Sequence, residues 1–167
     1  NPSLVQNVAR VCAAHLHAAM LLRKDRITPK RYYVEGCTWD WGTKARSGAS
    51  VQQTIDGIVP SEIAVCSEAT VLARSNCTRR EIEEILHLTH CDNHAFTSLI
   101  THAYHMRRAG KIAGDVRHDT GLSSTLCSIQ TPATVIADCR KRGHLQPSEE
   151  FLAAIIERAE PSSSTGI

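Results

Sequence analysis

Residues 77–130 carry the pattern that most restricts what this chain of 167 residues can fold into. The stretch TRRE at residues 78–81 is typical of a helix start, because the threonine and the glutamate can each satisfy the other's backbone amide. Apolar residues then recur at helical spacing up to a short turn at residues 91–93, and a second helical pattern continues to Arg108. We therefore predict two helices joined by a tight turn.

The second half of this region predicts a small hairpin. Gly110 is a natural helix end, because glycine tolerates the left-handed conformation that often follows a helix. Residues 112–117 and 122–129 have strand character, and the Asp-Thr-Gly triplet at 119–121 is typical of the turn between two strands. Helix, turn, helix and hairpin is the element order of winged-helix modules, and residues 61–130 resemble that family in element order and apolar spacing.

The segments on either side of this region predict further helices. Ser3-Leu4-Val5-Gln6 resembles a capping box, and Thr131-Pro132 and Pro147-Ser148 are typical of helix starts. We expect one mostly α domain with about six helices, a small β-hairpin and a helix-turn-helix, winged-helix-like centre. Its parts are an N-terminal helix at 3–23, an irregular region at 25–60 with a short strand near 31–35, the winged-helix-like core at 61–130, C-terminal helices at 131–160, and a flexible tail at 161–167.

Composition restricts the core and the compartment. Apolar residues make up 42% of the chain but aromatic residues only 4%, so the core has to be aliphatic. Seven cysteines without a C-x-x-C pair do not match a disulfide framework, and we expect an intracellular protein, cytoplasmic or nuclear, with reduced thiols. The longest apolar stretch, at residues 11–22, is shorter than the roughly 20 residues that a membrane span needs, so no membrane partner is expected.

The winged-helix resemblance implies nucleic-acid binding, with the second helix in the major groove and the hairpin against the backbone. Polar side chains on the outer face of that helix would contact bases, and cations would contact phosphates. These candidates are Ser98, Thr101, His105, Arg79, Arg80, Arg107, Arg108, Lys111 and Arg117. Against this, Glu83 and Glu84 make the first helix partly acidic, and a net charge of +2 does not by itself indicate a polyanion partner. A solvated polar face on an ordinary helical hairpin would give the same pattern.

A cluster of histidine and cysteine in the same region is a candidate metal site. His87, His90, Cys91 and His94 follow the pattern H-x-x-H-C-x-x-H, with steps of three and four that share one face of a continuous helix. Zinc binds four nitrogen or sulfur ligands in a tetrahedron, so zinc is the candidate cofactor. The spacing matches no standard zinc motif, and histidines at a helix end beside a small packed cysteine explain it equally well.

These observations favour a non-enzymatic binding module with no assigned catalytic residue. Nucleic acid, DNA or RNA, is the leading ligand. The alternative is a helical module for protein interaction or self-assembly, including a homo-oligomer, that uses the alanine-rich first helix or the last helix. A second alternative is a cysteine hydrolase with Cys37 as nucleophile and His144 as base, because Gly36-Cys37-Thr38-Trp39 and Gly143-His144 faintly resemble the papain-like pattern.

Overall fold

The computed structural model describes residues 2–34, 39–40, 45–46, 57–72, 78–91, 96–122 and 126–159. Within these residues the protein is mostly helical, with six helices and a few short strands, so the predicted mostly α class is confirmed. The elements in chain order are α1 (Pro2–Asp25), β1 (Lys30–Val34), β2 (Trp39–Asp40), β3 (Ala45–Arg46), α3 (Ser61–Ala64), β4 (Glu68–Leu72), α4 (Thr78–Cys91), β5 (Phe96–Ile100), α5 (Ala103–Thr120), β6 (Leu126–Gln130), α6 (Pro132–Arg142) and α7 (Pro147–Ala159).

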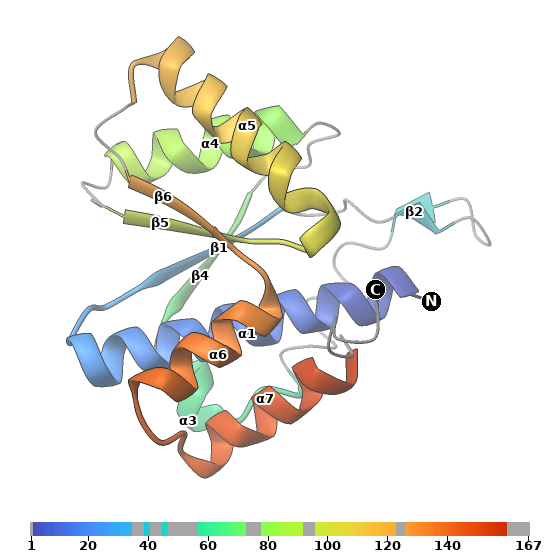
Figure 1. Ribbon diagram of the computed structural model, residues 1–167, viewed down its shortest axis with the longest axis vertical. Coiled ribbons are helices and arrows are strands. Elements are labelled where there is room, and N and C mark those ends of the chain that lie inside the picture. Colours follow the sequence, from blue (N-terminus) through green and yellow to red (C-terminus); the bar gives the residue numbers. More distant parts are fainter. Residues whose placement is uncertain are drawn as a thin grey trace.

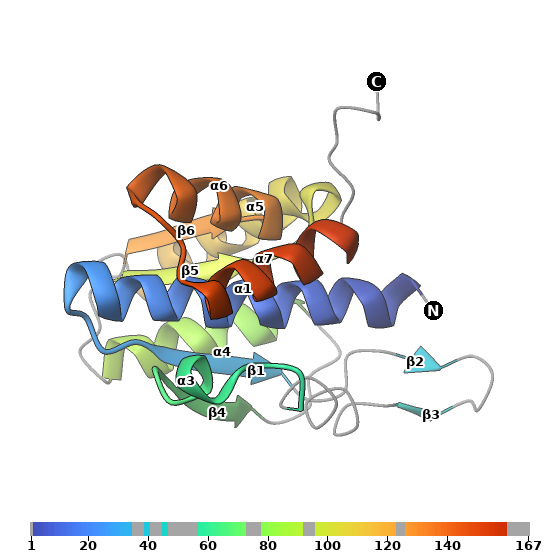
Figure 2. The same cartoon turned by 90° about the horizontal axis from the view of Figure 1, so that it is seen from below.

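Two parallel strand pairs form the middle of the molecule. β1 pairs with β4, with Lys30 opposite Glu68, and β5 pairs with β6, with Phe96 opposite Leu126. The two pairs are separate two-stranded sheets with no described hydrogen bond between them. In the views they lie next to each other at an angle, with β1 and β5 facing each other and all four strands running in the same general direction, and we call the two pairs together the strand layer (Figures 1 and 2). The carboxyl ends of these strands therefore face one edge of the layer. β2 and β3 form a separate antiparallel pair.

Helices cover both faces of this strand layer. α4 and α5 lie on one face, and α1, α6 and α7 lie on the other (Figure 1). A parallel pair needs a long crossover between its strands, and helices normally supply it. The order β4, α4, β5, α5, β6, α6 follows that rule, since each of these strands is followed by a helix that returns the chain to the opposite edge.

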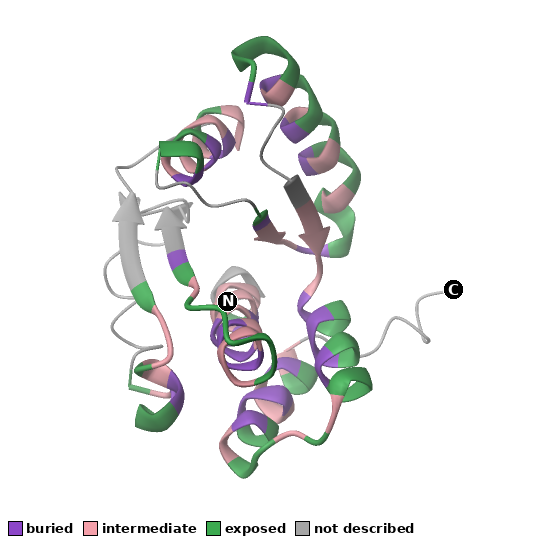
Figure 3. Ribbon diagram, turned by 90° about the vertical axis from the view of Figure 1, so that its left-hand side faces the viewer, coloured by how far each residue is buried: buried purple, intermediate pink, exposed green. Residues whose placement is uncertain are grey.

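The larger core lies among α1, α6 and α7. It is aliphatic, as the low aromatic content requires, and its fully buried side chains include Leu16, Met20, Val135, Leu152 and Ile156. Small residues on the same surfaces, such as Ala13 and Ala153, let α1 and α7 approach closely. Figure 3 shows the buried positions on the inward faces of the helices. This core holds α1 firmly against the strand layer.

A smaller core joins α4 to α5. Ile82 and Leu86 of α4 pack against Ala113 and Val116 of α5 and against Leu122, which follows that helix. Residues three and four apart on a helix share a face, so each helix presents one apolar stripe to the other. This contact fixes the direction of α5 and hence the position of its first turn.

The winged-helix detail of the prediction is not confirmed. Residues 96–100, placed in the second helix of the pair, form strand β5, and the hairpin expected across residues 112–129 is wrong because α5 extends to Thr120. Gly110 lies inside α5, and the helix instead ends at Gly121, whose φ of 71° is the left-handed conformation that glycine adopts at helix ends. Residue spacing accounts for the longer helix, since its buried Ala109, Ala113 and Val116 continue one helical stripe.

The flanking predictions fare better. The first helix, the strand near residue 31, the helix from Thr78, and the two C-terminal helices are all present close to their predicted bounds. At the start of the predicted core, α3 is only one turn long, because the chain leaves it after Ala64 and enters β4 at Glu68. No helix among the described residues has the length and apolarity needed to cross a membrane.

Candidate functional site

The carboxyl edge of the parallel strands is the place where the fold brings polar side chains together. In open parallel α/β sheets, ligands bind beyond the carboxyl ends of the strands, where the loops and helix N-termini converge, and the parallel pairs of this protein have a corresponding edge. The chain after β1 and after β4 lies outside the described residues. The junctions that follow β5 and β6 are described, and the backbone amide of Thr101 donates to the carbonyl of Gln130 at 2.9 Å, which holds the two junctions side by side.

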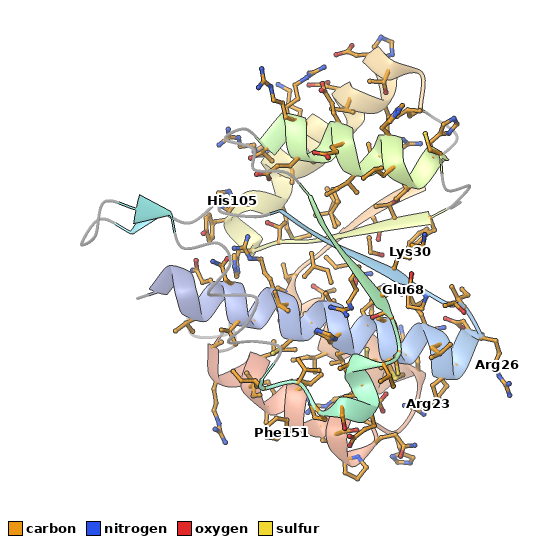
Figure 4. The ribbon with its side chains drawn as sticks, turned by 180° about the vertical axis from the view of Figure 1, so that it is seen from behind. Arg23, Arg26, Lys30, Glu68, His105 and Phe151 are labelled. Carbon is orange, nitrogen blue, oxygen red and sulfur yellow. The ribbon has the colours of Figure 1, made fainter. Side chains whose placement is uncertain are left out.

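The β5–α5 junction places three aromatic rings in four residues. The ring of His102 stacks on that of Tyr104, with centroids 5.8 Å apart and planes within 7°, and Tyr104 contacts His105 at 4.1 Å in a tilted arrangement. His102 is buried, whereas Tyr104 is 66% exposed and His105 is also exposed. Figure 4 shows His105 at this edge of the strands, with Lys30 and Glu68 at the opposite edge.

The start of α5 is electropositive. His102 occupies the N-cap position without a side-chain capping hydrogen bond, and the first turn holds no acidic residue. The first amides of a helix point outward and carry about half a positive charge, which attracts anions. Arg107, Arg108 and Lys111 are exposed on the next two turns and add three cations to this end of the helix. Arg108 lies three residues after His105 and four after Tyr104, so these three side chains share a face.

The neighbouring helix α6 differs in this respect. The Thr131 hydroxyl accepts from the Thr134 amide at 3.1 Å, and the Thr134 hydroxyl accepts from the Thr131 amide, which makes a complete capping box. Its first turn is therefore satisfied by its own side chains. At the β5–α5 junction, the Tyr104 hydroxyl donates to the side-chain oxygen of Gln6, on α1, at 3.3 Å. Of the two described junctions, the one before α5 lacks a side-chain cap, and within its first turn the His105 amide donates to the His102 carbonyl at 2.9 Å.

The predicted nucleic-acid-binding residues divide into two groups. Thr101, His105, Arg107, Arg108 and Lys111 lie together at and after the β5–α5 junction. The others are dispersed: Ser98 lies within β5, Arg79 and Arg80 lie on α4, and Arg117 lies half-buried in the last turns of α5.

Two of the dispersed residues are engaged within the fold. The Ser98 hydroxyl is 3.3 Å from the ring of His17 and 3.2 Å from the Ser128 hydroxyl, so it joins α1 to the β5–β6 pair. Arg79 donates to Asp119 at 2.6 Å and to Glu83 at 2.9 Å, and these hydrogen bonds raise its pKa, with Asp119 the larger cause. Both side chains are therefore already hydrogen-bonded to other residues of the protein.

Tyr104 is the residue of this edge that the sequence analysis did not select. The signal was present, because the β-prone stretch FTSLI at 96–100 ends directly before T-H-A-Y-H. Treating residues 94–108 as one helix concealed the strand-to-helix junction at which polar residues gather.

Three of the four predicted metal ligands lie on the last turns of α4. His87, His90 and Cys91 are exposed, and the Cys91 sulfur lies 3.7 Å from Nε2 of His87. His94 lies outside the described residues, and the described part of the chain contains no group of three ligands arranged around a metal position. The predicted hydrolase pair is likewise untested, because Cys37 lies outside the described residues, whereas His144 is exposed between α6 and α7.

Two other cysteines are unsuited to nucleophilic chemistry. Cys12 and Cys139 are buried in the larger core, and burial raises the pKa of each thiol to about 11. For Cys139 the nearby carboxylate of Glu149 acts in the same direction. Since the thiolate is the reactive form, both act as small apolar core residues at neutral pH.

Comparisons of the chain with protein-family models, with curated proteins and with solved structures give no match.

Proposed function

We propose that the protein binds a small phosphorylated ligand at the carboxyl edge of its parallel strands. The observation that carries the proposal is the β5–α5 junction, where an uncapped helix N-terminus, the Tyr104 ring and the exposed side chains of His105 and Arg108 meet. Ligands of α/β proteins bind at this edge, and anions bind at helix N-termini.

Each part of the junction suits a different part of such a ligand. The first backbone amides of α5, which no side chain caps, suit phosphate oxygens, and the Arg108 guanidinium suits them too, because its planar fork forms paired hydrogen bonds with phosphate. The exposed face of Tyr104 offers a stacking surface for a flat ring, and its hydroxyl is held by Gln6. A nucleoside monophosphate has both parts, a phosphate and an aromatic base.

The test is calorimetric titration of the full chain with three probes: a nucleoside monophosphate, the same nucleoside without phosphate, and inorganic phosphate. We expect the monophosphate to bind more tightly than either part. Replacing Arg108 with Gln should weaken monophosphate binding by about tenfold or more, since a charge-assisted hydrogen bond contributes about 1.5 to 3 kcal/mol. Tyr104→Ala should weaken the monophosphate more than inorganic phosphate.

His118→Gln is a matched control for His105→Gln. Both histidines are exposed on α5, but His118 lies in its last turn, away from the carboxyl edge. The His105 variant should bind more weakly and the His118 variant should bind as the wild type does. Equal effects of the two variants, or no binding of the monophosphate at millimolar concentration, would contradict the proposal.

Single-stranded nucleic acid is the second candidate, and the exposed cations of α5 favour it. Arg107, Arg108 and Lys111 continue from the Tyr104 ring along the helix, and proteins that bind single strands combine a stacking ring with a line of cations. The test is binding of a short single-stranded oligonucleotide at several salt concentrations. Lys111→Ala should lower the salt dependence for the oligonucleotide by about 0.7 in the log–log slope and leave the mononucleotide unaffected. An oligonucleotide that binds no more tightly than the mononucleotide would remove this candidate.

A further inference from the structure

The last turns of α4 carry a histidine and a cysteine in direct contact. His87 and Cys91 are four residues apart, so their side chains lie one above the other on the same face of the helix. Both are exposed, and the Cys91 sulfur lies 3.7 Å from Nε2 of His87. This contact is a weak sulfur–nitrogen hydrogen bond whose direction depends on the histidine tautomer.

The separation of these two atoms suits a tetrahedral metal ion. Zinc lies about 2.0 to 2.1 Å from histidine nitrogen and about 2.3 Å from cysteine sulfur, which at the tetrahedral angle places the two ligand atoms about 3.6 Å apart. The observed separation of 3.7 Å between the Cys91 sulfur and Nε2 of His87 is close to this expected value. The separation of the two atoms therefore matches that of two ligand atoms on one tetrahedral ion.

A groove beside α4 opens onto His87, whereas Cys91 is exposed but is not among the residues that line this groove. The groove is open, has a volume of about 610 Å³ and is also lined by Glu83, Glu84 and His90. The two carboxylates favour a cation in the groove, although Glu83 is also paired with Arg79. Arg80, on the same wall, acts in the opposite direction. An ion from solvent thus has direct access to His87, and nothing has to open first.

We propose that His87 and Cys91 form a two-residue site for a soft divalent cation such as Zn²⁺, with water in the remaining positions. Thiolate sulfur and imidazole nitrogen are ligands that zinc prefers. On binding, the Cys91 thiol releases one proton to solvent and a sulfur–metal bond forms, with no change of oxidation state. His90 lines the same groove as His87, but it makes no described contact with the Cys91 sulfur, so we do not assign it as a ligand. The pair precedes β5, at the end of that strand opposite the candidate ligand edge, so this site is independent of the proposed function.

The experiment is titration of untagged, reduced full-length protein with Co²⁺, followed by competition with Zn²⁺. Cobalt bound to a thiolate gives an intense charge-transfer absorption, which reports on sulfur coordination directly. We expect this absorption to saturate at one ion per chain, to disappear in Cys91→Ser, and to weaken on acidification because the thiol must lose its proton.

His90→Asn is the matched control for His87→Asn. Both residues are exposed, lie on α4 and line the same groove, and far-ultraviolet circular dichroism verifies that each variant is folded. The His87 variant should bind Co²⁺ at least about tenfold more weakly, because loss of a direct ligand costs no less than loss of a supporting group. The His90 variant should bind as the wild type does. Absence of the thiolate absorption, its persistence in Cys91→Ser, or equal losses in the two histidine variants would overturn the proposal.

Discussion

His15 gives the protein a specific sensitivity to acid. This residue of α1 is only 2% exposed, and its Nε2 accepts from the guanidinium of Arg31 on β1 at 3.0 Å. An imidazole that accepts at Nε2 carries its hydrogen on Nδ1 and is neutral. Nδ1 itself has no hydrogen-bond partner among the described residues. Burial, and secondly the charge of Arg31, lower the pKa of His15 from 6.5 to about 4.

The sign and the size of the effect follow from this difference. As the pH falls below 6.5, the unfolded chain takes up a proton at residue 15 before the folded chain does, so protonation favours unfolding. The stabilisation from neutral His15 is complete above pH 6.5 and is lost progressively down to pH 4. With about 1.4 kcal/mol for each tenfold change in proton affinity, the free energy of unfolding should lose about 2 kcal/mol on going from pH 7.5 to pH 5 through this residue alone.

The assay is urea unfolding of wild type and His15→Gln at pH 7.5, 6 and 5. Glutamine can still accept from Arg31 through its amide oxygen but does not titrate. The His17 pKa is also lowered, chiefly by burial, so the variant should retain part of the acid sensitivity. Its loss between pH 7.5 and pH 5 should be about 2 kcal/mol smaller than that of the wild type. His118→Gln, at an exposed histidine, should behave as the wild type does. A His15→Gln profile parallel to the wild-type profile would refute the reasoning.

Three further predictions concern the helical layer. Leu152→Ala should lower the free energy of unfolding by about 2 to 5 kcal/mol in urea denaturation, because Leu152 is fully buried in the larger core; a loss below about 1 kcal/mol would show that the core can close around the gap. Glu149→Gln should lower the free energy of unfolding by about 2 kcal/mol in the same assay, because the buried Glu149 carboxylate accepts from Arg23 at 2.7 Å. The loss is limited because Arg23 is 30% exposed and can be hydrated in the variant. An unchanged urea midpoint would contradict this prediction. Thr131→Ala should lower the thermal unfolding midpoint by the equivalent of about 1 kcal/mol, because it removes the cap of α6, whereas Thr131→Ser should restore most of it.

The flanking elements were predictable because their sequence signals are local. Thr131-Pro132 starts α6 in the manner that capping requires, and its side chain makes the expected bond to the Thr134 amide. The stretch at 30–34, which contains two tyrosines and a valine, forms β1, and the segment from Thr78 with helical periodicity forms α4. In these segments, propensity and tertiary environment favour the same structure.

The centre was not predictable in the same way, because its pairing is long-range. Residues 96–100 have apolar spacing that suits a helix as well as a strand, and their partner β6 begins 30 residues later at Leu126. Pairing of Ser98 with Ser128 is a contact that no local window contains. Once that stretch is a strand, the helix must start after it, so α5 occupies the residues in which a hairpin was expected.

The same error also affected the prediction of the candidate site. His105, Arg107 and Arg108 were predicted on the second helix and Lys111 just after it, and all four lie on α5. Their environment differs from the predicted one, because they begin that helix at the carboxyl edge of parallel strands. Residue types indicate which chemical groups are available, but the place where these groups come together depends on the order of the strands.

The two histidines of α1 show how this strand order is held. His15 and His17 are two residues apart, about 200° around a helix, so a sequence argument assigns them opposite directions and no common role. Both nevertheless contact the strand layer: His15 bonds Arg31 of β1, and His17 lies within hydrogen-bonding distance of Ser98 of β5. These strands are the inner members of the two parallel pairs, and α1 lies along both of them (Figure 2). Side chains on opposite sides of α1 thus contact different strand pairs. The described hydrogen bonds between strands connect only the two strands of each pair. The polar contacts of α1 therefore link the β1–β4 pair to the β5–β6 pair.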